Sequence, residues 1–185
     1  MLSEQQGLTR NDFYSIIVQI CMIHAREKDF DAVKDIFKQH EKWFPFVRRD
    51  YIKSMLINNA EKFGYEVSLE TNHDCYNYLI FEEEVLIAYA INRTGHKLGK
   101  SNVDTYKGDV ILHQIVAKNR NGSASRVIQK FFKEHRRVFL SVHNSNEIAK
   151  KFYEKNGMKI VGYITFSGII PGDIYFHDNL QEIFG

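Results

Sequence analysis

The sequence predicts an α/β (α+β) fold in a single domain, with a mixed central sheet of about seven strands flanked by four helices. A length of 185 residues suits one hydrophobic core. The chain is 44% hydrophobic and 14% aromatic, which is enough to fill that core. In the second half, apolar runs typical of strands alternate with helical patterns. Strand–helix–strand order predicts parallel neighbours joined by right-handed crossovers.

The N-terminal part is expected to begin with an arm. Residues 1–14 are mostly polar, so we assign them to this arm and residues 15–185 to the domain. Residues 15–25 are rich in β-branched side chains and predict a strand, although their length would also allow a buried helix.

Two helices and a hairpin follow. Residues 29–39 have apolar side chains at helical spacing after Asp29, a suitable N-cap, and residues 49–63 repeat that spacing. Residues 76–81 and 85–91 then read as two strands. The three glutamates between these strands predict a turn that stays in water.

The second half is the most informative. Residues 93–107 are polar and predict a loop, after which residues 109–117 predict a strand. A short polar turn over 118–124 leads into an amphipathic helix over 125–134 and a strand over 138–142. The remaining elements are a helix ended by Gly157 and two strands. We place these last elements at residues 146–156, 159–166 and 173–176.

Composition excludes several classes of protein. The net charge is only +2, which does not indicate a nucleic-acid or membrane partner. No apolar run approaches the ~20 residues that span a bilayer, and the first residues do not resemble a signal peptide. Cys21 and Cys75 are too few for a disulfide scaffold. We therefore expect a soluble, cytoplasmic protein without a membrane partner.

The turn at 118–125 is suited to hold an anion. It follows a strand and opens a helix, where the first backbone N–H groups have no helical partner and the helix dipole favours negative charge. Gly122 allows close approach of a ligand, and the small Ser123 and Ala124 leave room. Arg120 adds positive charge. An ordinary strand-to-helix connection with a serine N-cap is the alternative interpretation of this turn.

Two motifs in the right order resemble the GNAT superfamily of acetyl-CoA-dependent N-acyltransferases. The run Asn146-x-x-Ala149-x-x-x-Tyr153-x-x-x-Gly157 resembles the family's last signature, where Asn-x-x-Ala precedes a tyrosine and Gly-Phe. Residues 119–124 resemble its pyrophosphate loop, Gln/Arg-x-x-Gly-x-Gly/Ala. The chain departs from the family pattern by having Asn119 for Gln or Arg, a slightly shorter turn, and Met158 for Phe. The resemblance covers roughly residues 15–178 and implies the family's fold.

The resemblance also implies a set of functional residues. Acetyl-CoA would be the co-substrate and an amine the acceptor, so that the two react in a ternary complex. Tyr153 is implied as the general acid that protonates the CoA thiolate. The residues implied in CoA binding are Ile115, Val116, Ala117, Arg120, Asn121, Gly122, Ser123, Ala124 and Asn146.

The chemistry needs a base to take a proton from the amine, and the sequence leaves its identity open. His113 is the candidate we select, because an imidazole titrates near neutrality. Ser141 stands where some members carry a glutamate, and Asp109 lies early on the preceding strand, where others carry an acid. Strand alternation predicts His113 and Gln114 on opposite faces, so that only one of them meets the acceptor. Gln114 is therefore a candidate substrate-binding residue.

Other residues carry weaker expectations. Trp43 joins the first two helices, a region that covers the acceptor site in the family, and is a candidate substrate-binding residue; a hydrophobic plug is the alternative. The spacing of His143 and the two cysteines does not fit a metal site, so no metal is expected.

The acceptor and the reaction class leave alternatives. A small molecule or a protein could supply the amine. A phage-type enzyme that modifies a nucleobase is a variant, since basic residues such as Arg48 and Arg49 would suit phosphates. A non-catalytic CoA-binding sensor or interaction module is the alternative of another class. The oligomeric state is not predicted.

Overall fold

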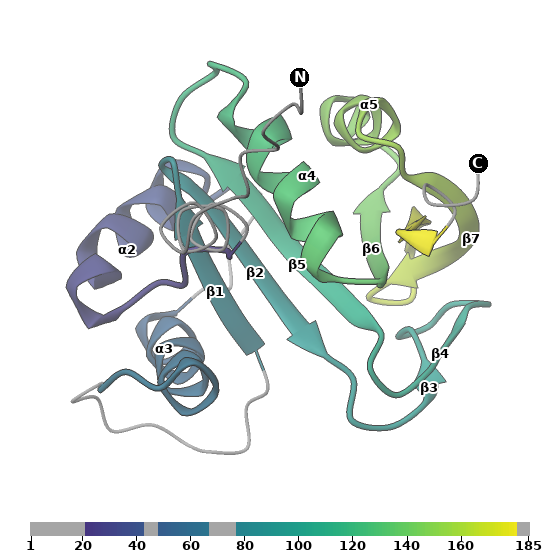
Figure 1. The fold of residues 1–185 in the computed structure, drawn as a ribbon. Coiled ribbons are helices and arrows are strands. Elements are labelled where there is room, and N and C mark those ends of the chain that lie inside the picture. Colours follow the sequence, from purple (N-terminus) through teal and green to yellow (C-terminus); the bar gives the residue numbers. More distant parts are fainter. Residues whose placement is uncertain (1–20, 43–47, 67–76, 181–185) are drawn as a thin grey trace, which may run out of the picture.

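A six-stranded mixed sheet lies at the centre of the molecule, with the strands in the order β1-β2-β5-β6-β8-β7 (Figure 1). The computed structural model describes residues 21–42, 48–66 and 77–180. Within these ranges β5 and β6 form the parallel pair, and the other neighbours are antiparallel. The predicted mixed sheet is confirmed. Its strands are β1 (Asn77–Glu82), β2 (Val85–Ile91), β5 (Val110–Ala117), β6 (Arg137–His143), β7 (Lys159–Phe166) and β8 (Ile170–Asp178).

The described sheet has six strands, and the predicted strand over 15–25 falls only partly within the described residues. Residues 15–20, like the arm over 1–14, lie outside the described residues. The remainder, 21–25, runs beside β1 and forms one antiparallel bridge, from His24 to Ile80. Backbone hydrogen bonds from Ala25 to Leu79 and from Phe81 to Ile23 flank it.

Within the described residues, four helices cover the two faces of the sheet, as predicted. On one face lie α2 (Phe30–Gln39), after the 3-10 turn η1 (Glu27–Asp29), and α3 (Arg49–Phe63). On the other face lie α4 (Ser123–Glu134) and α5 (Glu147–Lys155). Each face buries its own hydrophobic cluster against the strands. The described part of the chain contains no helix long and apolar enough to cross a membrane.

The predicted loop over 93–107 contains a small hairpin instead. Its strands are β3 (His96–Lys97) and β4 (Asp104–Thr105). The buried Thr105 accepts a hydrogen bond from the Asn92 amide at 2.8 Å and donates one to the backbone of His96 at 2.7 Å. These polar contacts, which carry no hydrophobic periodicity, hold the hairpin together. A bridge between Ser101 and Ile164 docks it on the outer edge of β7.

Candidate functional site

The two parallel strands at the centre of the sheet separate after a short contact. β5 and β6 pair at Val110–Val138 and Ile111–Phe139, whereas β5 stays paired with β2 as far as Ala117. A bulge in β5 lies just beyond the last pair between β5 and β6. Gln114 pairs with Ala88 and Leu112 with Tyr89, so His113 is an extra residue in β5. Figure 1 shows β5 and β6 diverging beside α4. The backbone of β5 that faces β6 beyond Ile111 therefore has no partner in the neighbouring strand.

The residues predicted to bind pantetheine lie on this separated part of β5. Ile115 and Ala117 are half-buried and pack toward the cluster under α4, whereas Val116 is buried in the cluster under α2 and α3. Their side chains thus belong to the core, and the main chain is the part of these residues that can bind a ligand along the separated edge.

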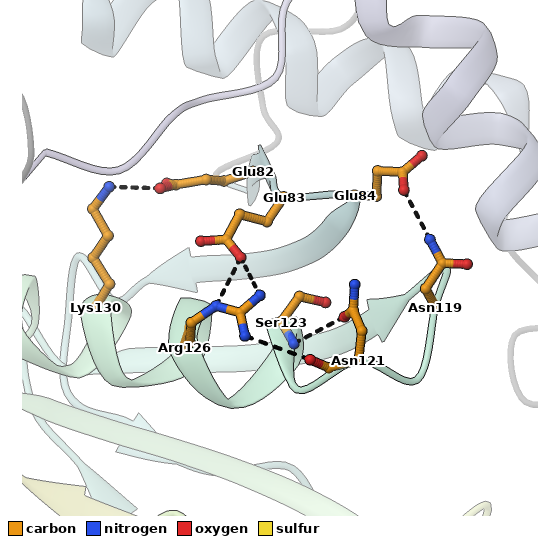
Figure 2. Close-up of polar contacts among 8 residues, drawn as sticks. All are labelled: Glu82, Glu83, Glu84, Asn119, Asn121, Ser123, Arg126 and Lys130. Carbon is orange, nitrogen blue, oxygen red and sulfur yellow. Dashed lines mark hydrogen bonds and ion pairs between the residues drawn. The ribbon is translucent and has the colours of Figure 1, made fainter.

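The strand leads directly into a turn with free backbone donors. Gly122 is the N-cap of α4 and has a left-handed φ of 82°, so the helix begins at Ser123, two residues earlier than predicted. The Ser123 N–H donates to Asn121 Oδ1 at 3.1 Å (Figure 2). The N–H groups of Asn121, Gly122 and Ala124 have no hydrogen-bond partner within the described ranges. An anion could therefore bind here through main-chain donors.

An acidic hairpin tip borders this turn. Glu84 accepts a hydrogen bond from Lys118 Nζ at 2.6 Å. Figure 2 shows that Glu84 also accepts one from Asn119 Nδ2, at 2.8 Å, and that Glu83 pairs with Arg126. Glu82 pairs with Lys130 at 2.6 Å. Glu83 and Glu84 are exposed, as the prediction of a turn in water requires. The three glutamates in addition compensate the charges of cations in the loop and in α4. Asn119, which departs from the family pattern, is held by Glu84.

The bulge overturns the predicted opposition of His113 and Gln114. In a regular strand, residues three apart lie on opposite faces of the sheet. Leu112 and Ile115 are three apart, yet both pack on the face of the sheet that α4 covers. The His113 ring lies on the opposite face of the sheet, the one that α2 and α3 cover, and contacts Asn77 there. Gln114 precedes Val116 by two residues and shares that face, and its Oε1 atom is buried without a hydrogen-bond partner in the described chain. The two polar side chains therefore stand together.

His113 and Tyr153 are in different protonation environments. The His113 side chain is exposed, yet the protein around its ring lowers its pKa. Tyr153 lies on the inner side of α5 and is only 8% exposed, and burial raises its pKa to about 12. Its ring packs near those of Phe152 and Tyr175, and no described residue bonds its hydroxyl. Tyr153 therefore keeps its proton at neutral pH.

Three further predicted residues have other surroundings. Asn146 is the N-cap of α5, and its Oδ1 accepts a hydrogen bond from Ala149 N at 3.2 Å. Asp109 is buried and forms an ion pair with Arg137 at 2.7 Å, at the end of β5 farthest from the loop. That pairing makes it unsuited to act as a base. Trp43 lies outside the described residues.

Sequence reasoning missed two contributors to the site. Arg126 lies in the first turn of α4, and its ion pair with Glu83 joins segments 43 residues apart. Asn77 on β1 contacts His113 on β5 across β2, and nothing in the sequence around Asn77 indicated a role in the site. Within the described chain, no group of three or more His, Cys, Asp or Glu side chains could hold a metal ion.

Solved structures show what this arrangement is similar to. A GNAT-family acetyltransferase from Bacillus cereus aligns with a TM-score of 0.56 at 18% identity, over 85% of this chain and 96% of its own. An aminoglycoside N(6')acetyltransferase from Legionella pneumophila aligns with a TM-score of 0.56 at 13% identity, over 88% and 95%. An N-acetyltransferase from Staphylococcus aureus aligns with a TM-score of 0.56 at 13% identity, over 85% and 97%.

No protein-family model and no curated protein matches the chain by sequence. The structural alignments nevertheless extend over almost the whole length of these three proteins. The chain therefore has the fold of the GNAT acetyltransferases.

Proposed function

We propose that the protein is an N-acetyltransferase that moves an acetyl group from acetyl-CoA to a primary amine. One observation carries the proposal: β5 and β6 separate directly beside a loop in which the N–H groups of Asn121, Gly122 and Ala124 have no partner among the described residues. The open edge of β5 can bond an amide-containing arm of a ligand, and the turn at residues 121–124, called the phosphate cradle below, can bind the ligand's pyrophosphate. The GNAT fold of the chain supports the same ligand.

In this proposal the loop binds the pyrophosphate. The backbone donors of Asn121, Gly122 and Ala124 supply hydrogen bonds, and Arg120, which is exposed, adds charge. The backbone of Ile115 to Ala117 bonds the amide-containing arm. The side chain of Ser123 is buried, and its N–H already bonds Asn121, so we assign Ser123 to shaping the loop. Asn146 acts by fixing the start of α5.

The reaction then needs two proton movements. The amine nitrogen forms a bond to the thioester carbonyl carbon, whose oxygen becomes an oxyanion, and the C–S bond breaks as the carbonyl re-forms. His113 takes the proton that the amine loses, and Tyr153 gives its proton to the departing thiolate. Gln114 Oε1, buried and unpartnered in the described chain, accepts a hydrogen bond from the amine and orients it. A backbone N–H on the open edge of β5 stabilises the oxyanion.

Calorimetry with acetyl-CoA tests the binding step, with desulfo-CoA and ATP as comparison ligands. We expect micromolar binding that Gly122→Glu abolishes, because the new side chain adds bulk and negative charge to the cradle. Gly108→Glu is the matched control, since Gly108 also has a left-handed φ, of 90°, and lies at the other end of β5. Absence of binding at millimolar acetyl-CoA would contradict the proposal.

Release of free CoA thiol in the presence of amine panels tests the chemical step. The panel includes small amines, amino sugars and peptides with a free N-terminus, because the acceptor is not fixed by the fold. Thiol release that depends on one class of amine would establish the transferase and its acceptor together. Tight binding without release in any panel would favour a non-catalytic CoA-binding protein.

A further inference from the structure

Arg126 lies beside the proposed phosphate cradle. Its Nη1 atom is 3.5 Å from the carbonyl oxygen of Asn121. A Cβ atom placed on Gly122 would likewise be 3.5 Å from Nη1. The guanidinium therefore borders the same turn in which three N–H groups have no partner in the described part of the chain (Figure 2).

The charge of Arg126 is compensated by Glu83. Glu83 Oε2 accepts hydrogen bonds from Nε at 3.0 Å and from Nη2 at 2.7 Å. The pair is open to water, since the side chains are 57% and 44% exposed. Ion pairs this exposed are weak, so another anion can displace the carboxylate at little cost.

The turn geometry does not require an acid at this position. Glu83 and Glu84 both have a left-handed φ, of 50° and 57°, in the two-residue connection between β1 and β2. Such connections favour glycine or asparagine, and the side chain of a glutamate is strained there. The backbone conformation therefore does not explain the two carboxylates, whereas their pairing with Arg126 and Lys118 does.

We infer that Arg126 is a further ligand of the pyrophosphate and that Glu83 competes with the pyrophosphate for it. This inference rests on the proposed function. On binding, the ligand's phosphate oxygens replace the Glu83 carboxylate on the guanidinium, and the carboxylate returns to water. Affinity for acetyl-CoA is therefore set by a side chain of the hairpin that does not itself touch the ligand.

Calorimetric titration with acetyl-CoA tests the exchange. Arg126→Gln should weaken binding about tenfold, the size expected for one charge-assisted contact. Glu83→Gln should strengthen binding about fivefold, because it frees the guanidinium from a surface pair. The double variant should bind like Arg126→Gln alone, since Glu83 acts through Arg126. Glu83→Gly tests whether the effect comes from the charge of Glu83 or from strain in the turn. It removes both the carboxylate and the strain, and it should strengthen binding to the same extent as Glu83→Gln.

The matched control is Asp104→Asn, which breaks the exposed ion pair between Asp104 on β4 and Lys97 on β3. It should leave affinity unchanged. A salt series adds a second readout, because binding by Glu83→Gln should fall more steeply with salt than binding by the wild type. Unchanged or weaker binding by both Glu83 variants would overturn the inference while leaving the proposed function intact. Failure of the wild type to bind acetyl-CoA would instead overturn the proposed function.

Discussion

His113 and Asn77 meet across the width of β2, with Nε2 of the imidazole 3.0 Å from Oδ1 of the amide. Asn77 lies on β1 and His113 on β5, so two strands that are not neighbours are connected by their side chains. With the amide oxygen as acceptor, Nε2 carries the proton and donates. Nδ1 of the neutral ring then holds a lone pair that can accept a proton.

This arrangement predicts that His113 controls the acidic limb of activity. Protonation blocks a base, so the rate should fall as the pH drops below the lowered pKa of His113. His113→Gln should lower turnover by at least about tenfold and leave acetyl-CoA affinity unchanged. Steady-state rates over pH, with calorimetry on the same samples, check both quantities.

Asn77→Asp gives a variant in which His113, the proposed base, is retained. A carboxylate beside Nε2 stabilises the imidazolium and raises its pKa, so the acidic limb should move to higher pH. An unmoved limb in Asn77→Asp, together with normal turnover in His113→Gln, would remove His113 from the proton transfer.

Tyr153→Phe tests the proposed general acid. Removal of the hydroxyl should lower turnover at least about tenfold while acetyl-CoA affinity stays nearly unchanged. Because burial raises the pKa of Tyr153 to about 12, its ionisation should produce no alkaline limb in the ordinary pH range. Tyr163→Phe is the control, since Tyr163 is 66% exposed on β7. Normal turnover by Tyr153→Phe would show that another group supplies the proton.

The sequence predicts the elements well where one periodicity dominates. The apolar positions of α2, for example, are Val33, Ile36 and Phe37, which fall on one helical face and are buried. The β3–β4 hairpin was missed because polar contacts such as Asn92–Thr105, which leave no periodic pattern, hold it. Boundaries also moved where a glycine rather than a serine caps the helix, as at Gly122.

The site was predictable only in its local parts. The turn at 118–124 and the helix after Asn146 are continuous in the sequence, so motif and spacing reveal them. The side of the sheet on which the His113 side chain lies depends on the one extra residue of the bulge. Strict alternation along the strand instead predicts that His113 and Gln114 lie on opposite sides. The pairing of Glu83 with Arg126 depends on which hairpin tip lies beside the loop, and this follows from the order of the strands.

Asp109→Asn should reduce the free energy of unfolding and leave turnover per folded molecule unchanged. Asp109 is 3% exposed and holds Arg137, whose guanidinium also lies over the rings of Tyr106, Phe139 and Phe176. Loss of one partner leaves the other charge partly desolvated, so we expect about 2–4 kcal/mol less free energy of unfolding. Urea unfolding measures this loss, with Asp104→Asn as the exposed control. A loss of turnover per folded molecule would restore Asp109 as a candidate base.

Two histidines beside Lys62 should make the fold sensitive to acid. Burial, together with the nearby Lys62 ammonium, lowers the pKa of His24 and of His135 to about 4 from 6.5. A lowered pKa means that the folded state binds fewer protons than the unfolded state, so stability is full above 6.5 and falls progressively toward pH 4. At pH 5 each histidine should reduce the free energy of unfolding by about 2 kcal/mol.

Urea unfolding at pH 7 and pH 5 measures this loss for the wild type and for the double variant His24→Phe, His135→Phe. The double variant should lose about 4 kcal/mol less than the wild type between the two pH values. Lys62→Met should reduce the loss in part, because it removes the cation but not the burial of the rings. An equal loss in the wild type and the double variant would mean that both imidazoles titrate normally in the folded protein.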